Sequence, residues 1–167
     1  MARMDVPTAR DEFEVAFTAA TGLAAPPVAS AFGDPGPQAD ELARLTAVGR
    51  KRATAGMLDD YLAAGEALPQ RGDLLIVLDG DEAPVCVIRT TSVEVIPFSS
   101  VDAAFAYDEG EGDRTLASWR AEHERFFTAR CEALGIDWHQ RREVVCERFE
   151  LVWPSPDVGG PRRRPTT

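Results

Sequence analysis

The sequence predicts an α+β domain in which helices pack on a small, strongly bent antiparallel sheet that closes toward a barrel. Three observations predict this fold class. The strand-like segments are separated by turns and irregular helices, without the regular strand–helix–strand spacing of a parallel sheet. No internal repeat is visible. The 167 residues, 44% of them hydrophobic and 28% charged, are typical of one domain that buries a core.

The first fifty residues are predicted to form two helices. Phe13 and Phe17 recur at helical spacing in the first, over residues 8–21. The second is expected over residues 37–48, where apolar residues form one stripe. Between them, the segment 24–36 is rich in Pro, Gly and Ala and is expected to be an irregular connection.

Four segments read as strands or extended chain. Residues 52–55 are a short extended piece, and the apolar run 74–78 has the length of a buried strand. Asp79-Gly80-Asp81 is a hairpin signal that leads into a long strand over 85–96, rich in Val, Ile and Thr. The last strand is expected over 143–153.

The remaining helices surround an acidic, glycine-containing loop. Short helices are expected over 58–65 and 98–107. The loop 108–113 follows, and Asp113 is expected to cap a long helix over 115–134. We therefore divide the chain into three parts. These are an N-terminal helical lead-in over 1–30, the domain over 31–153, and a disordered Pro/Gly/Arg-rich tail over 154–167.

Charge and cysteine usage limit the function classes. The net charge of −10 argues against wholesale coating of nucleic acid and against long-DNA binding, so phosphate binding would need a local basic patch. Cys86, Cys131 and Cys146 are widely spaced, and we expect them to be reduced and packed, as in a cytoplasmic protein. No apolar run approaches the length of a membrane span, so no membrane partner is expected.

The segment from Gly49 to Thr54 carries the strongest chemical signal. Lys51 is the one lysine in the chain, because every other basic residue is arginine. Unlike arginine, a buried lysine can lose its proton and act as a base. Thr54 places a hydroxyl three residues later. A simpler interpretation of Arg50 and Arg52 is that they compensate the dipole of the preceding helix.

Each candidate has a structural alternative. The Thr54 hydroxyl could satisfy a turn, and Glu109 and Glu111 could belong to a solvated loop. With Asp113 they alternate as ligands of a hard metal ion would, but an EF-hand count fails because Arg114 holds the glycine position. We expect neither a metal nor a cofactor.

Aromatic and histidine residues near this loop are ambiguous as well. His123 shares the long helix with apolar residues, so a hydrogen-bonded packing role is its default and proton transfer the minority interpretation. Trp119 is expected in the core, whereas Tyr107 is undecided between packing and stacking on a base. The two histidines lie 16 positions apart, without zinc-ligand spacing.

An ordered set of short motifs resembles the ASCH family, the domain named for homology to an activating signal cointegrator. The resemblance covers residues from about 31 to 153. It is carried by Gly49-Arg50-Lys51-Arg52-Ala53-Thr54, Leu68-Pro69, Gly72-Asp73, Asp79-Gly80, Pro84, Pro97-Phe98, Val101-Asp102, Phe105-Ala106, Glu109-Gly110-Glu111-Gly112-Asp113, Trp119-Arg120, His123, Phe126-Phe127 and Val145-Cys146-Glu147-Arg148-Phe149.

The resemblance implies a PUA-like β-barrel with a cleft at the Gly-x-Lys-x-x-Thr segment. Family members are thought to bind RNA or nucleosides. Some small bacterial members look like amidohydrolases that remove acyl groups from the exocyclic amine of cytidine, and another is thought to be a ribonuclease. Carried onto this chain, the amidohydrolase groups fall on Lys51, Thr54 and Glu109, with Glu111 as an alternative carboxylate. The added N-terminal helix and the long helix after the acidic loop leave the substrate open.

Two hypotheses follow. In the first, Thr54 is the nucleophile, Lys51 takes its proton, and Glu109 or Glu111 orients the lysine or passes the proton on. An ionised glutamate close to Lys51 would instead favour a charged lysine. In the second, the domain binds RNA or a modified nucleoside without catalysis. Candidate ligand-binding residues are Gly49, Arg50, Arg52, Arg89, Tyr107 and Arg120.

Overall fold

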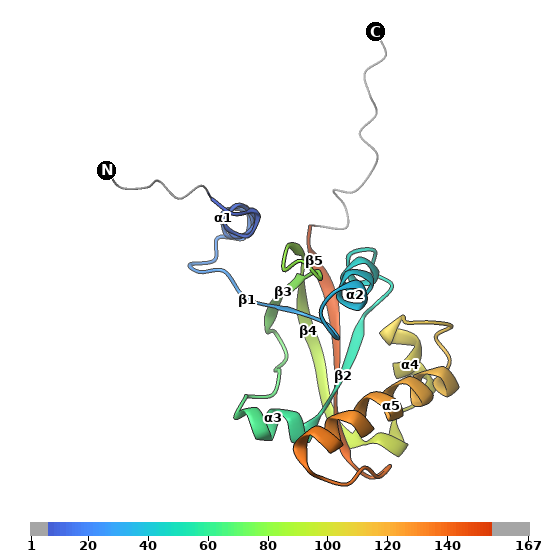
Figure 1. The fold of residues 1–167 in the computed structure, drawn as a ribbon. Coiled ribbons are helices and arrows are strands. Elements are labelled where there is room, and N and C mark those ends of the chain that lie inside the picture. The colour runs from blue at the N-terminus through green and yellow to red at the C-terminus, as the bar shows by residue number, and fades with distance from the viewer. Residues whose placement is uncertain (1–6, 155–167) are drawn as a thin grey trace.

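Residues 7–154, which the computed structural model describes, form a curled five-stranded sheet with helices against it (Figure 1). The strand order is β1-β3-β4-β5-β2. The strands are β1 (Val28–Ala31), β2 (Ala53–Met57), β3 (Leu74–Leu78), β4 (Pro84–Pro97) and β5 (Glu143–Trp153). The predicted fold class, α+β with a bent, barrel-like sheet, is confirmed, with the sheet closing as a half-barrel.

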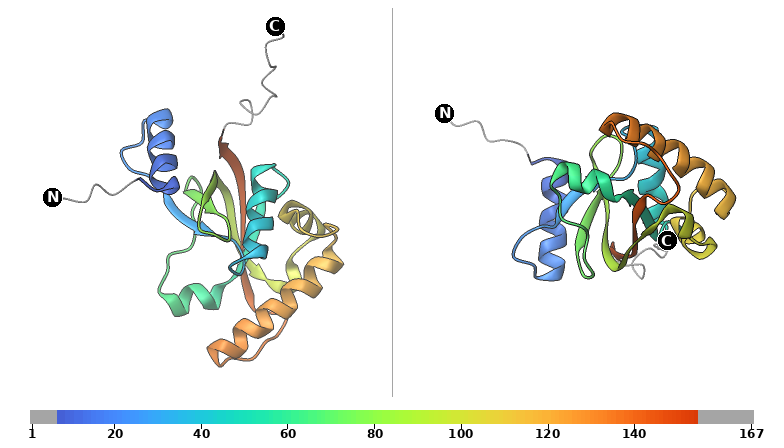
Figure 2. Two further views of the ribbon diagram at one scale, coloured as in Figure 1. Left: turned by 45° about the horizontal axis from the view of Figure 1, so that its top comes forward. Right: turned by 90° about the horizontal axis from the view of Figure 1, so that it is seen from below.

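Helices occupy the connections between the strands. The described α-helices are α1 (Ala9–Thr21), α2 (Pro37–Ala47), α3 (Leu58–Ala64), α4 (Ala103–Glu109) and α5 (Leu116–Leu134), and a 3₁₀ turn covers Phe98–Ser100. Figure 2 shows α1 on the opposite side of the molecule from α4 and α5 in both views. The helix predicted over 98–107 is thus divided, because Asp102 breaks it and caps α4 by accepting a hydrogen bond from the Phe105 N–H at 2.8 Å.

The long antiparallel pair β4–β5 lies inside the sheet, with β3 and β2 on either side. It runs antiparallel from Val87 opposite Trp153 to Pro97 opposite Glu143. The register shifts between Thr90 and Ser92, where β4 carries an extra residue. Such a bulge bends the strand and increases its twist, which contributes to the curl of the sheet.

The hairpin predicted at Asp79-Gly80-Asp81 joins β3 to β4. The Asp79 Oδ1 atom accepts hydrogen bonds from the N–H groups of Asp81 and Ala83 at 3.0 and 2.9 Å. This side-chain cap closes the turn, so the aspartate that signalled a turn in the sequence also forms it.

The sheet is mixed, whereas the sequence predicted antiparallel pairing throughout. β1 pairs with β3 in parallel, with Val28 opposite Leu75. This strand lies inside the segment 24–36, which was expected to be an irregular connection. The reason for the miss is physical: β1 has four residues on the sheet edge and exposes most of its side chains, so it shows no apolar alternation.

The N-terminal helix packs on the sheet. Phe17 of α1 is buried against Ile76 and Val87, and its ring meets Trp153 edge-on at 5.9 Å between centroids. Strand β1 also spans the boundary expected at residues 30 and 31. α1 begins at the Thr8 cap, which exchanges hydrogen bonds with Asp11.

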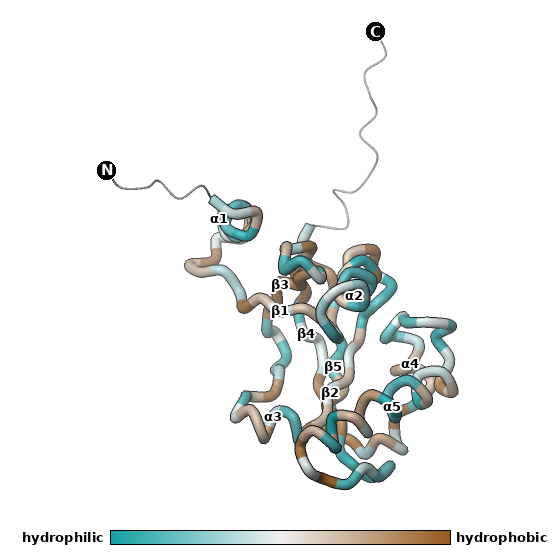
Figure 3. Tube along the Cα trace, in the orientation of Figure 1, coloured by the Kyte–Doolittle hydropathy of each residue, from teal (hydrophilic) through white to brown (hydrophobic). Residues whose placement is uncertain are grey.

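α5 covers one end of the half-barrel through an aromatic cluster. Polar and apolar residues are mixed along this helix (Figure 3), and the residues that it buries, Trp119, Phe127 and Cys131, recur at helical spacing. Trp119 stacks on Phe98 at 5.3 Å, and Phe127 and Trp138 meet the same ring edge-on. The helix is capped by Thr115, whose hydroxyl accepts from the Ser118 N–H at 3.2 Å, and not by Asp113 as predicted.

All three cysteines are free and buried. Burial raises the pKa of the Cys86 and Cys146 thiols to about 12. None of the helices within residues 7–154 is long and apolar enough to cross a membrane. The tail predicted to be disordered lies, beyond Pro154, outside the described residues.

Candidate active site

Lys51 is directed into the interior by the way α2 ends. Gly49 adopts φ 73°, a left-handed conformation that glycine reaches without strain. The N–H groups of Arg50 and Lys51 then both donate to the Leu45 carbonyl, at 2.9 and 3.0 Å. The chain turns inward before β2 begins, and Lys51 is left only 2% exposed.

The acidic loop is attached to this segment by backbone and side-chain hydrogen bonds. Arg50 Nε donates to the Gly110 carbonyl at 2.8 Å, and its Nη2 donates to the Gly112 carbonyl at 2.9 Å. Gly110 has φ 75°, and a Cβ there would lie 2.3 Å from the Arg50 carbonyl oxygen. Only glycine allows the two backbones to approach so closely. Arg50 and Gly110 together therefore bring the carboxylates of Glu109 and Glu111, about sixty positions later in the sequence, to Lys51.

Two glutamates face the lysine. Lys51 Nζ lies 2.7 Å from Glu111 Oε1 and 3.9 Å from Glu109 Oε2. The Glu109 side chain is 1% exposed and that of Glu111 35% exposed. The neighbours of the Lys51 amine are therefore acids. The two flanking arginines are engaged with other groups, because Arg50 bonds the acidic loop and Arg52 pairs with Asp108.

His123 completes this row of charged groups. Its Nε2 atom lies 3.3 Å from Glu109 Oε2, and its Nδ1 atom lies 3.0 Å from the Trp119 carbonyl oxygen. Burial would raise the pKa of Glu109, but the positive charges of Lys51 and His123 outweigh it and lower that pKa. Burial would lower the pKa of His123, but the hydrogen bond and charge of Glu109 raise it.

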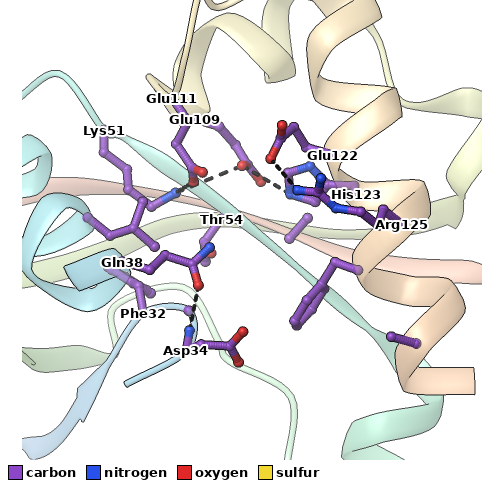
Figure 4. Close-up of a pocket in the computed structure, with 15 residues that line it drawn as sticks. Phe32, Asp34, Gln38, Lys51, Thr54, Glu109, Glu111, Glu122, His123 and Arg125 are labelled. Carbon is purple, nitrogen blue, oxygen red and sulfur yellow. Dashed lines mark hydrogen bonds and ion pairs between the residues drawn. The ribbon is translucent and has the colours of Figure 1, made fainter. Parts of the chain in front are cut away.

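These groups line one cavity of about 340 Å³ (Figure 4). Lys51, Thr54, Glu109 and Glu111 all lie on its wall, where Thr54 comes from β2 and the glutamates from the end of α4 and the loop after it. The other lining residues are Phe32, Gly33, Asp34, Gln38, Leu42, Ala55, Glu122, His123, Arg125, Phe126 and Ala129. The structure thus brings together the four residues predicted as catalytic; their catalytic role stays a prediction.

The residues predicted to bind ligand lie elsewhere. Gly49, Arg50, Arg52, Arg89, Tyr107 and Arg120 are not among the residues that line the cavity. Arg89 pairs with Glu150 across the sheet, with 3.0 Å between Nε and Oε1. Arg120 Nη2 donates to the Ser99 carbonyl at 3.2 Å. Their part in binding stays a prediction, with the guanidinium groups engaged by the protein itself.

Tyr107 is half exposed, and an arginine side chain packs on its ring. The Arg114 guanidinium lies 3.7 Å from the centre of its ring, so the ring face that a base would stack on is occupied by Arg114 on that side.

Sequence reasoning missed several lining residues. His123 was given a packing role, yet it reaches the cavity from α5. The available signal was its spacing, one helical turn from Trp119 and one from Phe127, which puts it on the buried face. Phe32, which directly follows β1, stacks on Phe149 at 5.6 Å, and the centre of its ring lies 5.5 Å from Lys51 Nζ.

The metal alternative for the acidic loop finds no support in the geometry. Within residues 7–154, no group of three or more His, Cys, Asp or Glu side chains is arranged to hold a metal ion. Asp113 instead accepts hydrogen bonds from the N–H and hydroxyl of Thr115 at 2.9 and 2.8 Å.

Comparisons with known proteins identify the family of this chain. The model of the ASCH domain matches residues 28–153. The chain belongs to the ASCH-domain family, whose fold is PUA-like. An ASCH domain from Lactobacillus crispatus is similar in structure, with a TM-score of 0.78 and 30% identity over 90% of this chain and 99% of that one. A protein from Enterococcus faecalis gives a TM-score of 0.75 and 33% identity over 92% and 94% of the two chains. No curated protein matches the sequence.

Proposed function

We propose that this ASCH-domain protein is a hydrolase that removes an acyl group from the exocyclic amine of a cytidine-type nucleoside. The observation that carries the proposal is the grouping of one buried ammonium, one hydroxyl and two carboxylates around a single cavity. The resemblance of the Lys51–Thr54 segment to amidohydrolase members of the family supports the same chemistry.

The size and charge of the cavity favour a small ligand. A volume of about 340 Å³ lies at the lower end of the range for small-molecule sites. Its wall carries Asp34, Glu109, Glu111 and Glu122 against Lys51 and Arg125. A polyanion would meet net negative charge there, and the whole chain is also acidic at −10. Aromatic rings of Phe32 and Phe126 offer apolar faces for a base.

The proposed reaction consumes one water and yields the nucleoside and a carboxylic acid. Lys51 passes a proton to Glu111 across their 2.7 Å hydrogen bond and so gains a lone pair. The amine then takes the proton of the Thr54 hydroxyl while the Thr54 oxygen attacks the amide carbon. Glu111 gives its proton to the leaving amine, the C–N bond breaks, and an acyl ester remains on Thr54.

Water completes the cycle. After acylation Lys51 is again an ammonium and Glu111 a carboxylate, so Lys51 first passes a proton to Glu111 across their hydrogen bond. The neutral amine takes a proton from water, the resulting hydroxide attacks the ester carbon, and the Thr54 oxygen leaves and recovers that proton from Lys51. Glu111 then returns its proton to Lys51. Glu109 stays ionised throughout and balances the positive charge that moves on and off Lys51.

Turnover of N4-acetylcytidine tests the proposal. The wild-type protein is expected to release cytidine, measured by liquid chromatography. Lys51→Arg keeps the charge but cannot act as a base, and Thr54→Val removes the hydroxyl, so each is expected to lose at least about 10²-fold in kcat. Arg44→Lys is the matched control, because Arg44 is exposed and pairs with Glu41 outside the cavity; its rate is expected to equal that of the wild type.

Two rival functions are outcomes of the same experiment. A ribonuclease would cleave a labelled single-stranded RNA while leaving N4-acetylcytidine intact. A binding module would cleave neither and would bind RNA with an affinity that falls steeply with salt concentration. Either result would replace the amidohydrolase proposal.

A further inference from the structure

His123 meets an oxygen acceptor at each ring nitrogen. Nδ1 lies 3.0 Å from the Trp119 carbonyl oxygen, and Nε2 lies 3.3 Å from Glu109 Oε2. A carbonyl oxygen and a carboxylate can only accept a hydrogen bond, whereas a neutral imidazole has one donor and one acceptor nitrogen. Charge on Lys51 and His123 lowers the pKa of Glu109 and so favours its ionised form. With Glu109 ionised, the two contacts are satisfied together only by the doubly protonated ring.

The environment of the ring suits a cation. The His123 side chain is 15% exposed and stacks on the Trp119 indole, with centroids 4.1 Å apart and planes inclined by 15°. The Phe127 ring approaches at 5.6 Å. An aromatic face attracts a positive charge, so the indole holds the imidazolium in one orientation.

Glu109 depends on this contact. Its Oε2 atom accepts from His123, while its Oε1 atom is buried and has no hydrogen-bond partner among residues 7–154. Lys51 Nζ, at 3.9 Å from Oε2, lies beyond hydrogen-bonding distance and acts on Glu109 only through charge. Without His123, the buried carboxylate would keep only the smaller influence of the Trp119 indole N–H, which is itself buried and has no hydrogen-bond partner among residues 7–154.

We propose that His123 is a positioning residue: as an imidazolium it keeps Glu109 ionised and aimed at Lys51. This inference rests on the proposed function for its catalytic meaning. The same inference gives the two glutamates different roles. Glu109 is a fixed counter-charge, and Glu111, which is 35% exposed and 2.7 Å from the amine, is the carboxylate that exchanges a proton.

The pH behaviour follows from the groups that face His123. They are Glu109 from α4, Glu111 from the acidic loop, Lys51 ahead of β2 through Glu109, and Glu122 and Arg125 on α5 beside the cavity. The net effect on the ring is that of the nearby carboxylate, and the pKa of His123 lies above its ordinary value. As the pH rises through that pKa, the ring loses one of its two protons and its positive charge, so Glu109 loses its cationic partner and one of the two ring contacts fails.

Nuclear magnetic resonance of the full chain tests the charge state without any substrate. The sequence has two histidines, and a His139→Gln variant assigns their signals. Long-range ¹H–¹⁵N spectra are expected to show both His123 nitrogens protonated, with a titration midpoint above the ordinary value of 6.5. A midpoint at or below that value, or a neutral single tautomer at lower pH, overturns the proposal.

Paired variants test the positioning role. His123→Gln keeps a donor that can reach Glu109 but cannot titrate, and His123→Leu removes the donor. The ¹³C carboxyl titration midpoint of Glu109 is expected to rise in His123→Leu and to change less in His123→Gln. In turnover of N4-acetylcytidine, His123→Leu is expected to lose about 10²-fold in kcat. His123→Gln is expected to retain most of it and to lose the decline on the alkaline side of the wild-type pH profile.

The outcomes separate the two proposals. Equal loss in both variants with an unchanged pH profile, or an unchanged Glu109 titration, marks His123 as a packing residue and overturns the inference. An inactive wild type with the expected titrations of His123 and Glu109 refutes the proposed reaction and still supports the positioning of Glu109.

Discussion

Replacing Glu109 by glutamine tests how much the buried charged groups Lys51, Glu109 and His123 contribute to the free energy of unfolding. Glu109→Gln keeps the shape of the side chain and removes its charge. Both Glu109 and Lys51 are 1% exposed, and removing one member of a buried pair typically costs about 3–5 kcal/mol. Here Lys51 retains Glu111 at 2.7 Å, and the new amide oxygen can still accept from His123. We therefore expect a loss of about 2–3 kcal/mol in the free energy of unfolding.

Urea denaturation at pH 7 followed by tryptophan fluorescence measures this loss. For a chain of this size about 1 kcal/mol corresponds to roughly 2–4 °C, so Tm is expected to fall by roughly 4–12 °C. Glu150→Gln is the matched control. Its partner Arg89 and Glu150 itself are about half exposed, and such surface pairs contribute at most about 1 kcal/mol.

The pH dependence of the difference has a definite sign. The pKa of Glu109 is lowered in the folded protein, so the stabilisation by its carboxylate is present above the ordinary value of 4.5 and is lost as the pH falls through the folded pKa. The pKa of His123 is raised, so its contribution is present below 6.5 and is lost as the pH rises through its folded pKa. Wild type and Glu109→Gln should thus converge in acid. A loss no larger than that of Glu150→Gln, or a difference that grows toward pH 3, would show that the charge of Glu109 does not stabilise the fold.

Three further predictions concern the glycines of the acidic loop, the buried thiols and the cap of α5. Gly110→Ala is expected to destabilise the protein by well over the roughly 1 kcal/mol of a strained alanine, because its Cβ would lie 2.3 Å from the Arg50 carbonyl oxygen. Gly112→Ala, with φ 54° and open space around it, should cost only about 1 kcal/mol in the same urea titration. Cys86 and Cys146 are buried with a pKa of about 12, so a thiol reagent at pH 8 should label them only after unfolding, and rapid labelling of the native protein would contradict their burial. Thr115→Ala should lower stability by about 1 kcal/mol through loss of the α5 cap, and a change within error would show that Asp113 suffices.

Periodicity and turn chemistry predicted most of the elements. The strands at 74–78 and 143–153 and the long strand after Asp79 were found where their apolar and β-branched residues indicated. The edge strand β1 was not predictable, because a strand that exposes three of its four residues has no apolar alternation. Its parallel pairing is a non-local property of the sheet and leaves no trace in the local sequence.

The sequence predicted several residues of the candidate site, but not which of them are buried or in contact. The single lysine and its neighbouring threonine indicated where to look, and both line the cavity. The sequence could not decide between Glu109 and Glu111, because exposure distinguishes them: the first is buried beside His123 and the second is open to solvent. The local sequence shows that the loop is acidic. Which of its glutamates is buried depends on contacts with residues such as Lys51, which lies about sixty positions earlier in the sequence.

The arginines show what a local sequence leaves undecided. Arg50 and Arg52 were candidates for ligand binding because they flank the lysine. Their side chains instead bond Gly110, Gly112 and Asp108 and so hold the acidic loop in place. A row of cations in a sequence has the same appearance whether its partners are phosphates or the protein's own carbonyl and carboxylate oxygens.

A crystal structure of the Thr54→Val variant with N4-acetylcytidine would show whether the cavity is the nucleoside site. We expect the base in the cavity between Phe32 and Phe126, with the amide carbon facing residue 54 and the amide group within reach of Lys51 and Glu111. Nucleoside bound at another surface, or a cavity that stays empty while the protein is saturated with the compound, would rule out this site.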